Sequence, residues 1–262
     1  MAAPGAGKCI MYKFFVSPSQ INKEQNRVVI TGPDVNHIKN VLRMKKGEEV
    51  SISNGKDGRE YCCAILEMHE DSVLLELRFI KEEGSELPVT VTLFQGLPKA
   101  DKMELIIQKC VELGVTRIVP VSMKRCVVKL DDKKSASKIE RWQAIAESAA
   151  KQSKRGIVTE ITPVMTFENA VGEAARSDIR LLPYEMADNE TMNETRKIFE
   201  NIKPGSDISV FIGPEGGFDE GEIEMAKAVG LRTITLGKRI LRTETAGMTV
   251  MSWIVLMTEG KK

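Results

Sequence analysis

The spacing of apolar residues changes once along this chain of 262 residues. Up to about residue 80, short apolar and β-branched runs are separated by turn signals, of which Asn54-Gly55 and Asp57-Gly58 are the clearest. We expect strands at residues 12–16, 27–30, 49–53, 60–66 and 72–80. The first part of the chain is therefore predicted to form a small β-barrel.

One helix is expected to interrupt these strands. It begins near Gly32-Pro33-Asp34, where proline suits the first helical position, and its spacing would turn Val35, Ile38, Val41 and Leu42 toward the core. The charged, proline-ended stretch at 81–88 then has the composition of a domain boundary. We expect two domains, at residues 11–80 and 88–262.

Beyond residue 88, apolar strands alternate with helices of 3.6-residue period, which is typical of a helix-flanked, mainly parallel sheet. Capping boxes formed by Asp101 with Glu104 and by Asp219 with Glu222 would begin two of the helices. The first of these helices would bury Met103, Ile106, Ile107 and Cys110. Strands are expected at 89–94, 115–122, 157–161, 178–182, 208–212 and 232–236, and further helices at 138–152, 167–175, 191–201 and 220–229.

Two of these strands end in glycine loops. Residues 213–218 follow the strand at 208–212, and a polar loop that starts at Gly237 follows the strand at 232–236. Glycine lets the backbone approach a ligand, and loops at the carboxyl ends of parallel strands are the usual ligand sites of open α/β sheets. The alternative is that these glycines only make turns. Neither loop has the spacing of a P-loop or of G-x-G-x-x-G, so phosphate cradling is not the first expectation.

Composition restricts the function further. The chain has 38 Lys and Arg against 37 Asp and Glu, so RNA would have to be bound by local patches, and a small-molecule enzyme fits this balance better. Five cysteines show no C-x-x-C spacing and only two histidines could join them, so we predict no metal site and a reducing cytoplasm. No apolar run has the length of a membrane span, and residues 1–10 lack the apolar core of a secretory signal.

The two glycine loops carry longer motifs. G-P-E-G-G-F at 213–218 and L-G-K-R-I-L-R-T-E-T-A at 236–246 resemble the signature of the SPOUT superfamily, and more narrowly of the RsmE-type 16S rRNA uridine-N3 methyltransferases. Residues 37–47 and 147–155 are similar to two further family elements. The chain departs from the family pattern at Asn36, where a second histidine is frequent, and at Lys124 and Cys126, which flank Arg125 where the family usually reads E-R-S.

This resemblance implies an α/β fold in which a small N-terminal PUA-like β-barrel precedes a C-terminal SPOUT α/β domain with a deep trefoil knot. It also implies S-adenosyl-L-methionine as cofactor, a uridine of 16S rRNA in the small ribosomal subunit as substrate, and a homodimer. The family-like beginning M-Y-K-F-F-V starts at Met11, so residues 1–10 are left out of the fold expectations.

The resemblance also assigns site residues. Arg242 is the candidate catalytic residue, because a guanidinium can face the charge that develops on a uracil carbonyl, although a salt bridge to Glu244 or Glu215 would explain it equally well. Either of these carboxylates could accept the proton or could hold loop amides. The expected cofactor-binding residues are Leu181, Leu182, Pro183, Glu185, Ile212, Gly213, Pro214, Glu215, Gly216, Leu236, Gly237, Ile240, Leu241, Arg242, Thr245 and Ala246.

Basic side chains are the candidates for RNA contact. These are Arg43, Lys45, Lys46, Arg125 and Arg155, and solvated surface charge is the alternative for each. Two rival functions also remain open: an α/β enzyme that binds a nucleotide or dinucleotide in the glycine loops, and a non-catalytic RNA-binding or assembly factor.

Overall fold

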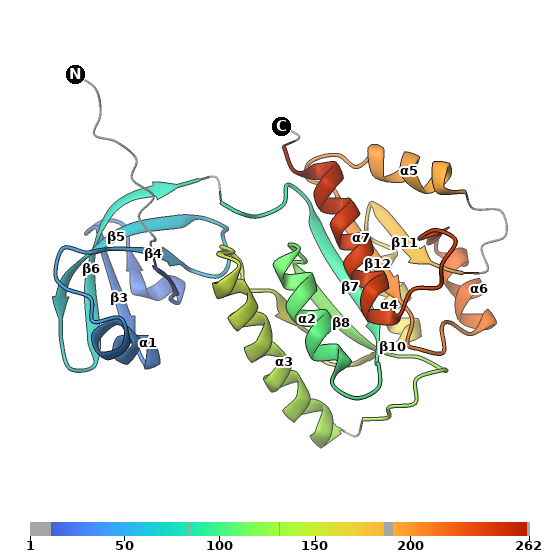
Figure 1. The fold of residues 1–262 in the computed structure, drawn as a ribbon, viewed down its shortest axis with the longest axis horizontal. Helices are drawn as coiled ribbons and strands as arrows, with labels where there is room; N and C mark the ends of the chain where they lie inside the picture. Colours follow the sequence, from blue (N-terminus) through green and yellow to red (C-terminus); the bar gives the residue numbers. More distant parts are fainter. Residues whose placement is uncertain (1–11, 83, 131, 186–190, 261–262) are drawn as a thin grey trace. The chain divides into compact units, whose positions relative to one another are not determined.

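The computed structural model describes residues 12–82, 84–130, 132–185 and 191–260, so Cys9 and the first ten residues lie outside it (Figure 1). The chain divides into two compact units. Unit 1 comprises Met1–Glu86 and Lys154–Ile157, and unit 2 comprises Leu87–Ser153 and Val158–Lys262. A short segment that follows a long helix of unit 2 thus belongs to unit 1.

Unit 1 is built on a six-stranded sheet in the order β1-β4-β5-β6-β3-β2. β1 runs parallel to β4, and the other neighbours are antiparallel. Alternate residues of β3, Val28 and Ile30, are fully buried, as the period of two predicts. The strands are β1 Tyr12–Phe15, β2 Ile21–Asn22, β3 Arg27–Thr31, β4 Glu49–Ser53, β5 Glu60–Met68 and β6 Ser72–Lys81.

The helical segment of unit 1 differs from its expectation in one respect. Helix α1 (Pro33–Asn36) continues directly into η2 (His37–Val41), a π-helical turn in which Leu42 N–H donates to the His37 carbonyl at 2.8 Å. Val35 and Ile38 are buried as predicted, but Val41 is 61% exposed. The prediction for Val41 is wrong because it assumed α-helical spacing, and the wider π turn moves later residues off the buried face.

Unit 2 contains a seven-stranded sheet in the order β10-β8-β7-β12-β11-β13, with β9 beside β8. Every strand pairing described in it is parallel, which confirms the sheet that the strand and helix alternation predicted. The expected strand at 157–161 is reduced to two residues, because Ile157 pairs with Gly55 of unit 1 instead. The strands are β7 Thr90–Gly96, β8 Arg117–Ser122, β9 Glu160–Ile161, β10 Met165–Thr166, β11 Ile179–Pro183, β12 Asp207–Ile212 and β13 Arg232–Ile234.

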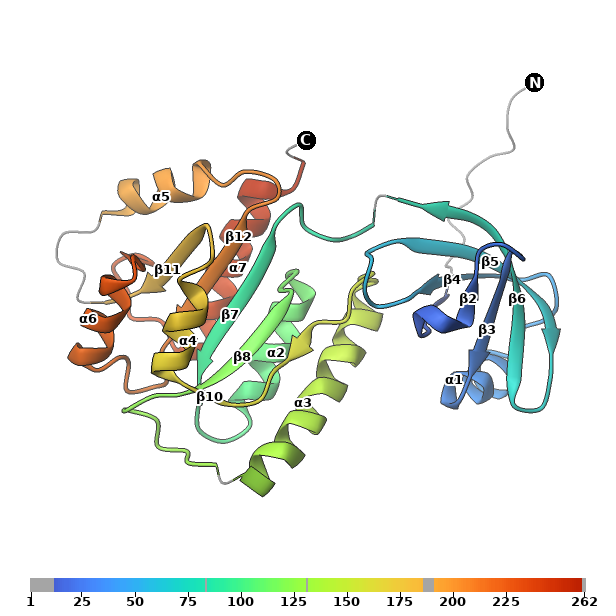
Figure 2. The same cartoon turned by 180° about the vertical axis from the view of Figure 1, so that it is seen from behind.

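Helices cover both faces of this sheet. α2, α3 and α7 pack together on one face, and α4 and α6 pack on the other, as the two opposite views show (Figures 1 and 2). The predicted apolar face of α2 is fully buried. The helices are α2 Lys102–Glu112, α3 Asp132–Gln152, α4 Phe167–Ala174, α5 Met192–Glu200, α6 Glu220–Ala228 and α7 Thr243–Thr258.

Only one of the two expected capping boxes forms. At α6 the Asp219 carboxylate accepts from Gly221 N–H at 3.2 Å, and Glu222 accepts from Asp219 N–H at 2.9 Å. At α2 the Asp101 side chain makes no cap, and Glu104 instead binds Arg141 at 2.8 Å. The second expectation is wrong because an ion pair with another helix holds the required glutamate.

Candidate functional site

A cavity of about 510 Å³ lies at the carboxyl ends of three neighbouring strands of unit 2, β12, β11 and β13. Its main walls are residues 183–185 at the end of β11, 212–218 at the end of β12, and 235–243 between β13 and α7, together with Ala246 in the first turn of α7. This volume is within the range of small-molecule sites. The two glycine loops are therefore close together and border open space.

Most of the residues expected to bind a cofactor line this cavity. Leu181 and Leu182 do not, because both are fully buried in β11, and Thr245 does not, because it is exposed outside the cavity on α7. The expected residues that do line it are Pro183, Glu185, Ile212, Gly213, Pro214, Glu215, Gly216, Leu236, Gly237, Ile240, Leu241, Arg242 and Ala246.

Several lining residues were not among those expectations. Lys238, Arg239 and Thr243 belong to the second motif, so the motif itself could have indicated them. Lys102 had no such signal, because it lies 113 positions before its partner Glu215. The others are Tyr184, Gly217, Phe218, Glu220, Thr235 and Arg125, the last of which was expected at RNA.

The loop after β12 is a tight turn with glycine at positions 213, 216 and 217. Gly217 has φ +66°, and its N–H donates to the Pro214 carbonyl at 2.9 Å. A Cβ on Gly213 would lie 3.2 Å from Gly217 Cα and 3.3 Å from the Phe218 ring. A side chain at position 213 would therefore push against the turn, and Gly213 itself lines the cavity.

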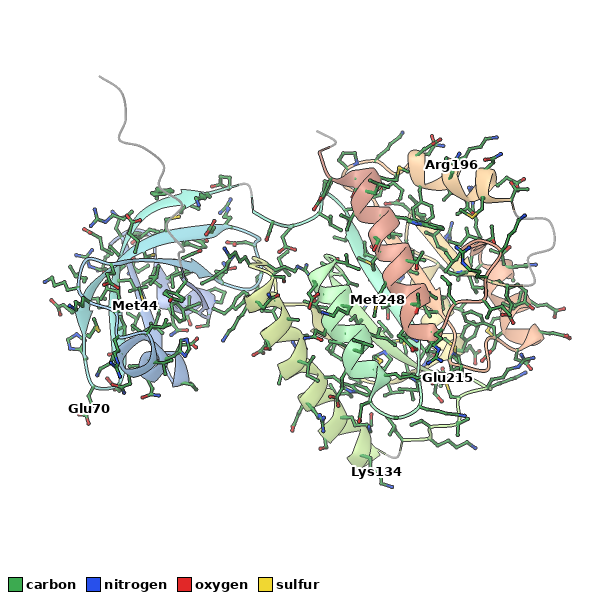
Figure 3. All side chains as sticks on the ribbon, in the orientation of Figure 1. Met44, Glu70, Lys134, Arg196, Glu215 and Met248 are labelled. Carbon is green, nitrogen blue, oxygen red and sulfur yellow. The ribbon has the colours of Figure 1, made fainter. Side chains whose placement is uncertain are left out.

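Glu215 is held by two neighbouring groups. The Oε1 atom of Glu215, a residue labelled in Figure 3, lies 2.8 Å from Lys102 Nζ and accepts from Lys99 N–H at 3.1 Å. Burial alone would raise the pKa of Glu215, but the hydrogen bonds from Lys102 and Lys99 outweigh it and leave the pKa below its usual value. Of the two roles left open for this carboxylate, the geometry favours the structural one.

Arg242 is exposed, lines the cavity and occupies the N-cap position of α7. Among the described residues its guanidinium has no hydrogen bond or ion pair. The expected alternative of a salt bridge to Glu215 or Glu244 is not found, because both carboxylates face Lys102, at 2.8 Å and 3.6 Å. The positive charge of Arg242 is therefore available to a ligand.

The comparisons with known proteins match this geometry. Family models described as an RNA methyltransferase domain and an RNA methyltransferase PUA domain match residues 85–255 and 30–78. The chain is 38% identical to the ribosomal RNA small subunit methyltransferase E of Bacillus subtilis, over 95% of this chain and 98% of that protein. It is 33% identical to the Synechocystis protein of the same name, over 95% of this chain and 78% of that one.

The chain belongs to the ribosomal RNA small subunit methyltransferase E family. A crystal structure of the Neisseria gonorrhoeae methyltransferase E bound to S-adenosylmethionine is 29% identical, with a TM-score of 0.79 and coverage of 95% of this chain and 98% of that one. The expected order of a PUA-like domain followed by an α/β methyltransferase domain with a mainly parallel sheet is confirmed.

The basic residues that were expected to contact RNA lie in different parts of this methyltransferase E family member. Arg43, Lys45 and Lys46 are exposed on unit 1, and Arg43 lies two residues after the end of η2 with φ +54°. Arg125 lines the cavity of unit 2, where its Nη1 donates to the Gly216 carbonyl at 3.1 Å. These positions leave an RNA role open.

The position of Arg155 contradicts its expected role in RNA contact. Arg155 is 2% exposed, and its Nη2 lies 2.6 Å from Glu86 Oε2. The expectation that Arg155 contacts RNA is wrong, because a buried, carboxylate-bound guanidinium cannot reach a phosphate.

In the part of the chain that the structure describes, no group of three or more His, Cys, Asp or Glu side chains is placed to hold a metal ion. No described helix combines the length and apolarity that crossing a bilayer requires.

Proposed function

We propose that this methyltransferase E family member transfers a methyl group from S-adenosylmethionine to N3 of a uridine in 16S rRNA of the small ribosomal subunit. The observation that carries the proposal is one cavity bordered by both motif loops, with Arg242 at its wall and no ion-pair partner for that guanidinium among the described residues. The name of its Bacillus subtilis relative and the cofactor in the Neisseria gonorrhoeae structure support the reaction class.

The cavity walls suit an adenosine-sized ligand. Ile212, Leu236 and Leu241 supply apolar surface, and Ile240 lines the cavity while it is 81% exposed. A ligand that covers Ile240 removes this surface from water, which favours binding. The glycine turns add backbone groups within reach of polar ligand atoms.

The cofactor and the protein contribute different parts of the proposed methyl transfer. When bound, S-adenosylmethionine supplies an electrophilic methyl group. N3 must lose its proton, and negative charge then develops on the flanking carbonyl oxygens of the uracil. Arg242 faces this charge with a planar, permanently charged set of donors. Glu215 does not accept the N3 proton, because Lys102 and Lys99 occupy its carboxylate.

Unit 1 is proposed to hold the RNA. Arg43, Lys45 and Lys46 are exposed close together in sequence, where they can contact phosphates. The target uridine must leave its stack, or come from an irregular RNA region, before N3 is reachable.

A homodimer, a trefoil knot at the two motif loops and a cytoplasmic location complete the proposal. Leu256 on α7 is 72% exposed and borders an apolar groove with Phe199 and Trp253, which supports burial of this helix in a dimer.

Nucleoside mass spectrometry of 16S rRNA tests the function. Ribosomes from cells that lack this protein should lose one N3-methyluridine, and the purified protein with labelled cofactor should restore it. An unchanged nucleoside profile, or a lost methyl group at another atom, would overturn the proposal. RNA binding without methyl transfer would favour an assembly factor.

A further inference from the structure

Lys102 lies where three segments of unit 2 meet. It is the first residue of α2, which follows β7, and it lines the cavity. Its Nζ lies 2.8 Å from Glu215 Oε1, in the loop after β12. The same Nζ lies 3.6 Å from Glu244 Oε2, in the first turn of α7. One cation therefore joins segments that are far apart in sequence.

Both carboxylates depend on this cation. Glu244 Oε2 is buried and has no hydrogen-bond partner among the described residues, so Lys102 is its nearest compensating charge. The pKa of Lys102 is raised, chiefly by its hydrogen bond to Glu215. Without Lys102, the two carboxylates would lose the cation that they share, and like charges that are close together repel.

The backbone of the loop after β12 depends on Glu215. Lys99 N–H donates to both carboxylate oxygens, at 3.1 and 3.3 Å, so Glu215 is bound both by the chain that precedes α2 and by Lys102. The same loop contains Gly213 and Gly216, which line the cavity. A displacement of Glu215 would therefore change the shape of the cavity.

We propose that Lys102 is a positioning residue for methyl transfer: it binds Glu215 and Glu244 and thereby holds the loop at 213–218 against the start of α7 in the shape that admits the cofactor. This inference rests on the proposed function and adds a residue to it. Lys102 acts through the two carboxylates and takes no part in the bond changes.

The test compares Lys102→Met with Lys102→Arg and with Lys109→Met. Lys109 is a matched control because it lies on the same helix and is bound to a carboxylate, Glu112, at 2.9 Å, but outside the cavity. Lys102→Met should raise the KM for S-adenosylmethionine about tenfold, as expected for the loss of a charged hydrogen bond, and should change kcat much less. Lys102→Arg should restore most of the affinity, and Lys109→Met should match the wild type.

Hydrogen exchange of the ligand-free protein gives a second measurement that does not depend on the cofactor. The amides of residues 213–218 should exchange faster in Lys102→Met than in Lys109→Met. Equal exchange in the two variants, or faster exchange with an unchanged KM, would overturn the positioning role. If the wild-type protein does not bind S-adenosylmethionine, the proposed function fails, while the exchange comparison still decides whether Lys102 holds the loop.

Discussion

The Thr243 hydroxyl donates a hydrogen bond to the Gly213 carbonyl at 2.6 Å. The same hydroxyl accepts from Gln95 Nε2 at 2.9 Å, and both Thr243 and Gln95 are buried. This chain of bonds connects the end of β7, the loop after β12 and the first turn of α7. The two motifs are thus joined by a side chain of one and a backbone group of the other.

Replacement of Thr243 tests this connection. Thr243→Val keeps the shape but removes the hydroxyl, so the Gly213 carbonyl and one Gln95 N–H lose their partner. An unsatisfied buried group costs about 1–3 kcal/mol, and we expect the affinity for S-adenosylmethionine measured by calorimetry to fall about tenfold. Thr243→Ser should retain it.

Thr249 offers the matched control for this threonine. Its hydroxyl donates to the Thr245 carbonyl within α7 at 2.8 Å, and it does not line the cavity. Thr249→Val should bind the cofactor as the wild type does. If Thr243→Val also binds normally, the connection between the two loops does not shape the site.

The parts of this fold that sequence could predict are those with a local cause. The apolar face of α2, the capping box at Asp219 and the glycine loops after β12 and β13 each follow from residues close together in the chain. The parallel sheet follows from the alternation of apolar strands with helices along the chain. For the same reason the motifs indicated most of the cavity wall before its geometry was known.

The missed features have non-local causes. Nothing near Lys102 indicates that its partner Glu215 is 113 positions away. Arg155 lies in a basic stretch of sequence that is typical of the surface, yet it is buried because it binds Glu86, which is 69 positions earlier in the chain and in the same unit. Val41 is exposed because a π turn replaces the expected helix geometry.

Gly213→Val should block cofactor binding. The added Cβ would lie 3.2 Å from Gly217 Cα and 3.3 Å from the Phe218 ring, so the turn cannot close as it does in the wild type. We expect calorimetric affinity for S-adenosylmethionine to be lost, with overpacking costing about 1–3 kcal/mol of stability. Gly172→Val is the control, because a Cβ on that exposed helical glycine meets nothing within 4 Å. An unchanged affinity of the Gly213→Val variant for S-adenosylmethionine would show that this loop is only a turn and does not shape the cofactor site.

Arg242→Ala should remove methyl transfer and leave most of the cofactor affinity. Loss of a donor that stabilises developing charge costs about 100–1,000-fold in kcat. The fold should persist, because the guanidinium has no partner among the described residues. Steady-state kinetics with labelled cofactor and 16S rRNA measures the effect, and Arg232→Ala, an exposed arginine at the start of β13, is the control. Near-normal turnover would exclude Arg242 from catalysis.

Glu86→Ala should destabilise unit 1 strongly. Glu86 Oε1 accepts from Gly156 N–H at 2.7 Å and Oε2 accepts from Arg155 Nη2 at 2.6 Å, and the two side chains are only 16% and 3% exposed. Removal of one partner of a buried ion pair costs about 3–5 kcal/mol, because the other charge stays buried. Urea unfolding followed by hydrogen exchange in β5 measures this loss.

Glu82→Ala is the control for Glu86→Ala. Its carboxylate lies 2.8 Å from Arg59 Nε in the same unit, but the side chains are 67% and 39% exposed. Exposed ion pairs contribute about 0–1 kcal/mol, so this variant should unfold nearly as the wild type does. Equal stability of the two variants would mean that burial of Arg155 does not depend on its bond to Glu86.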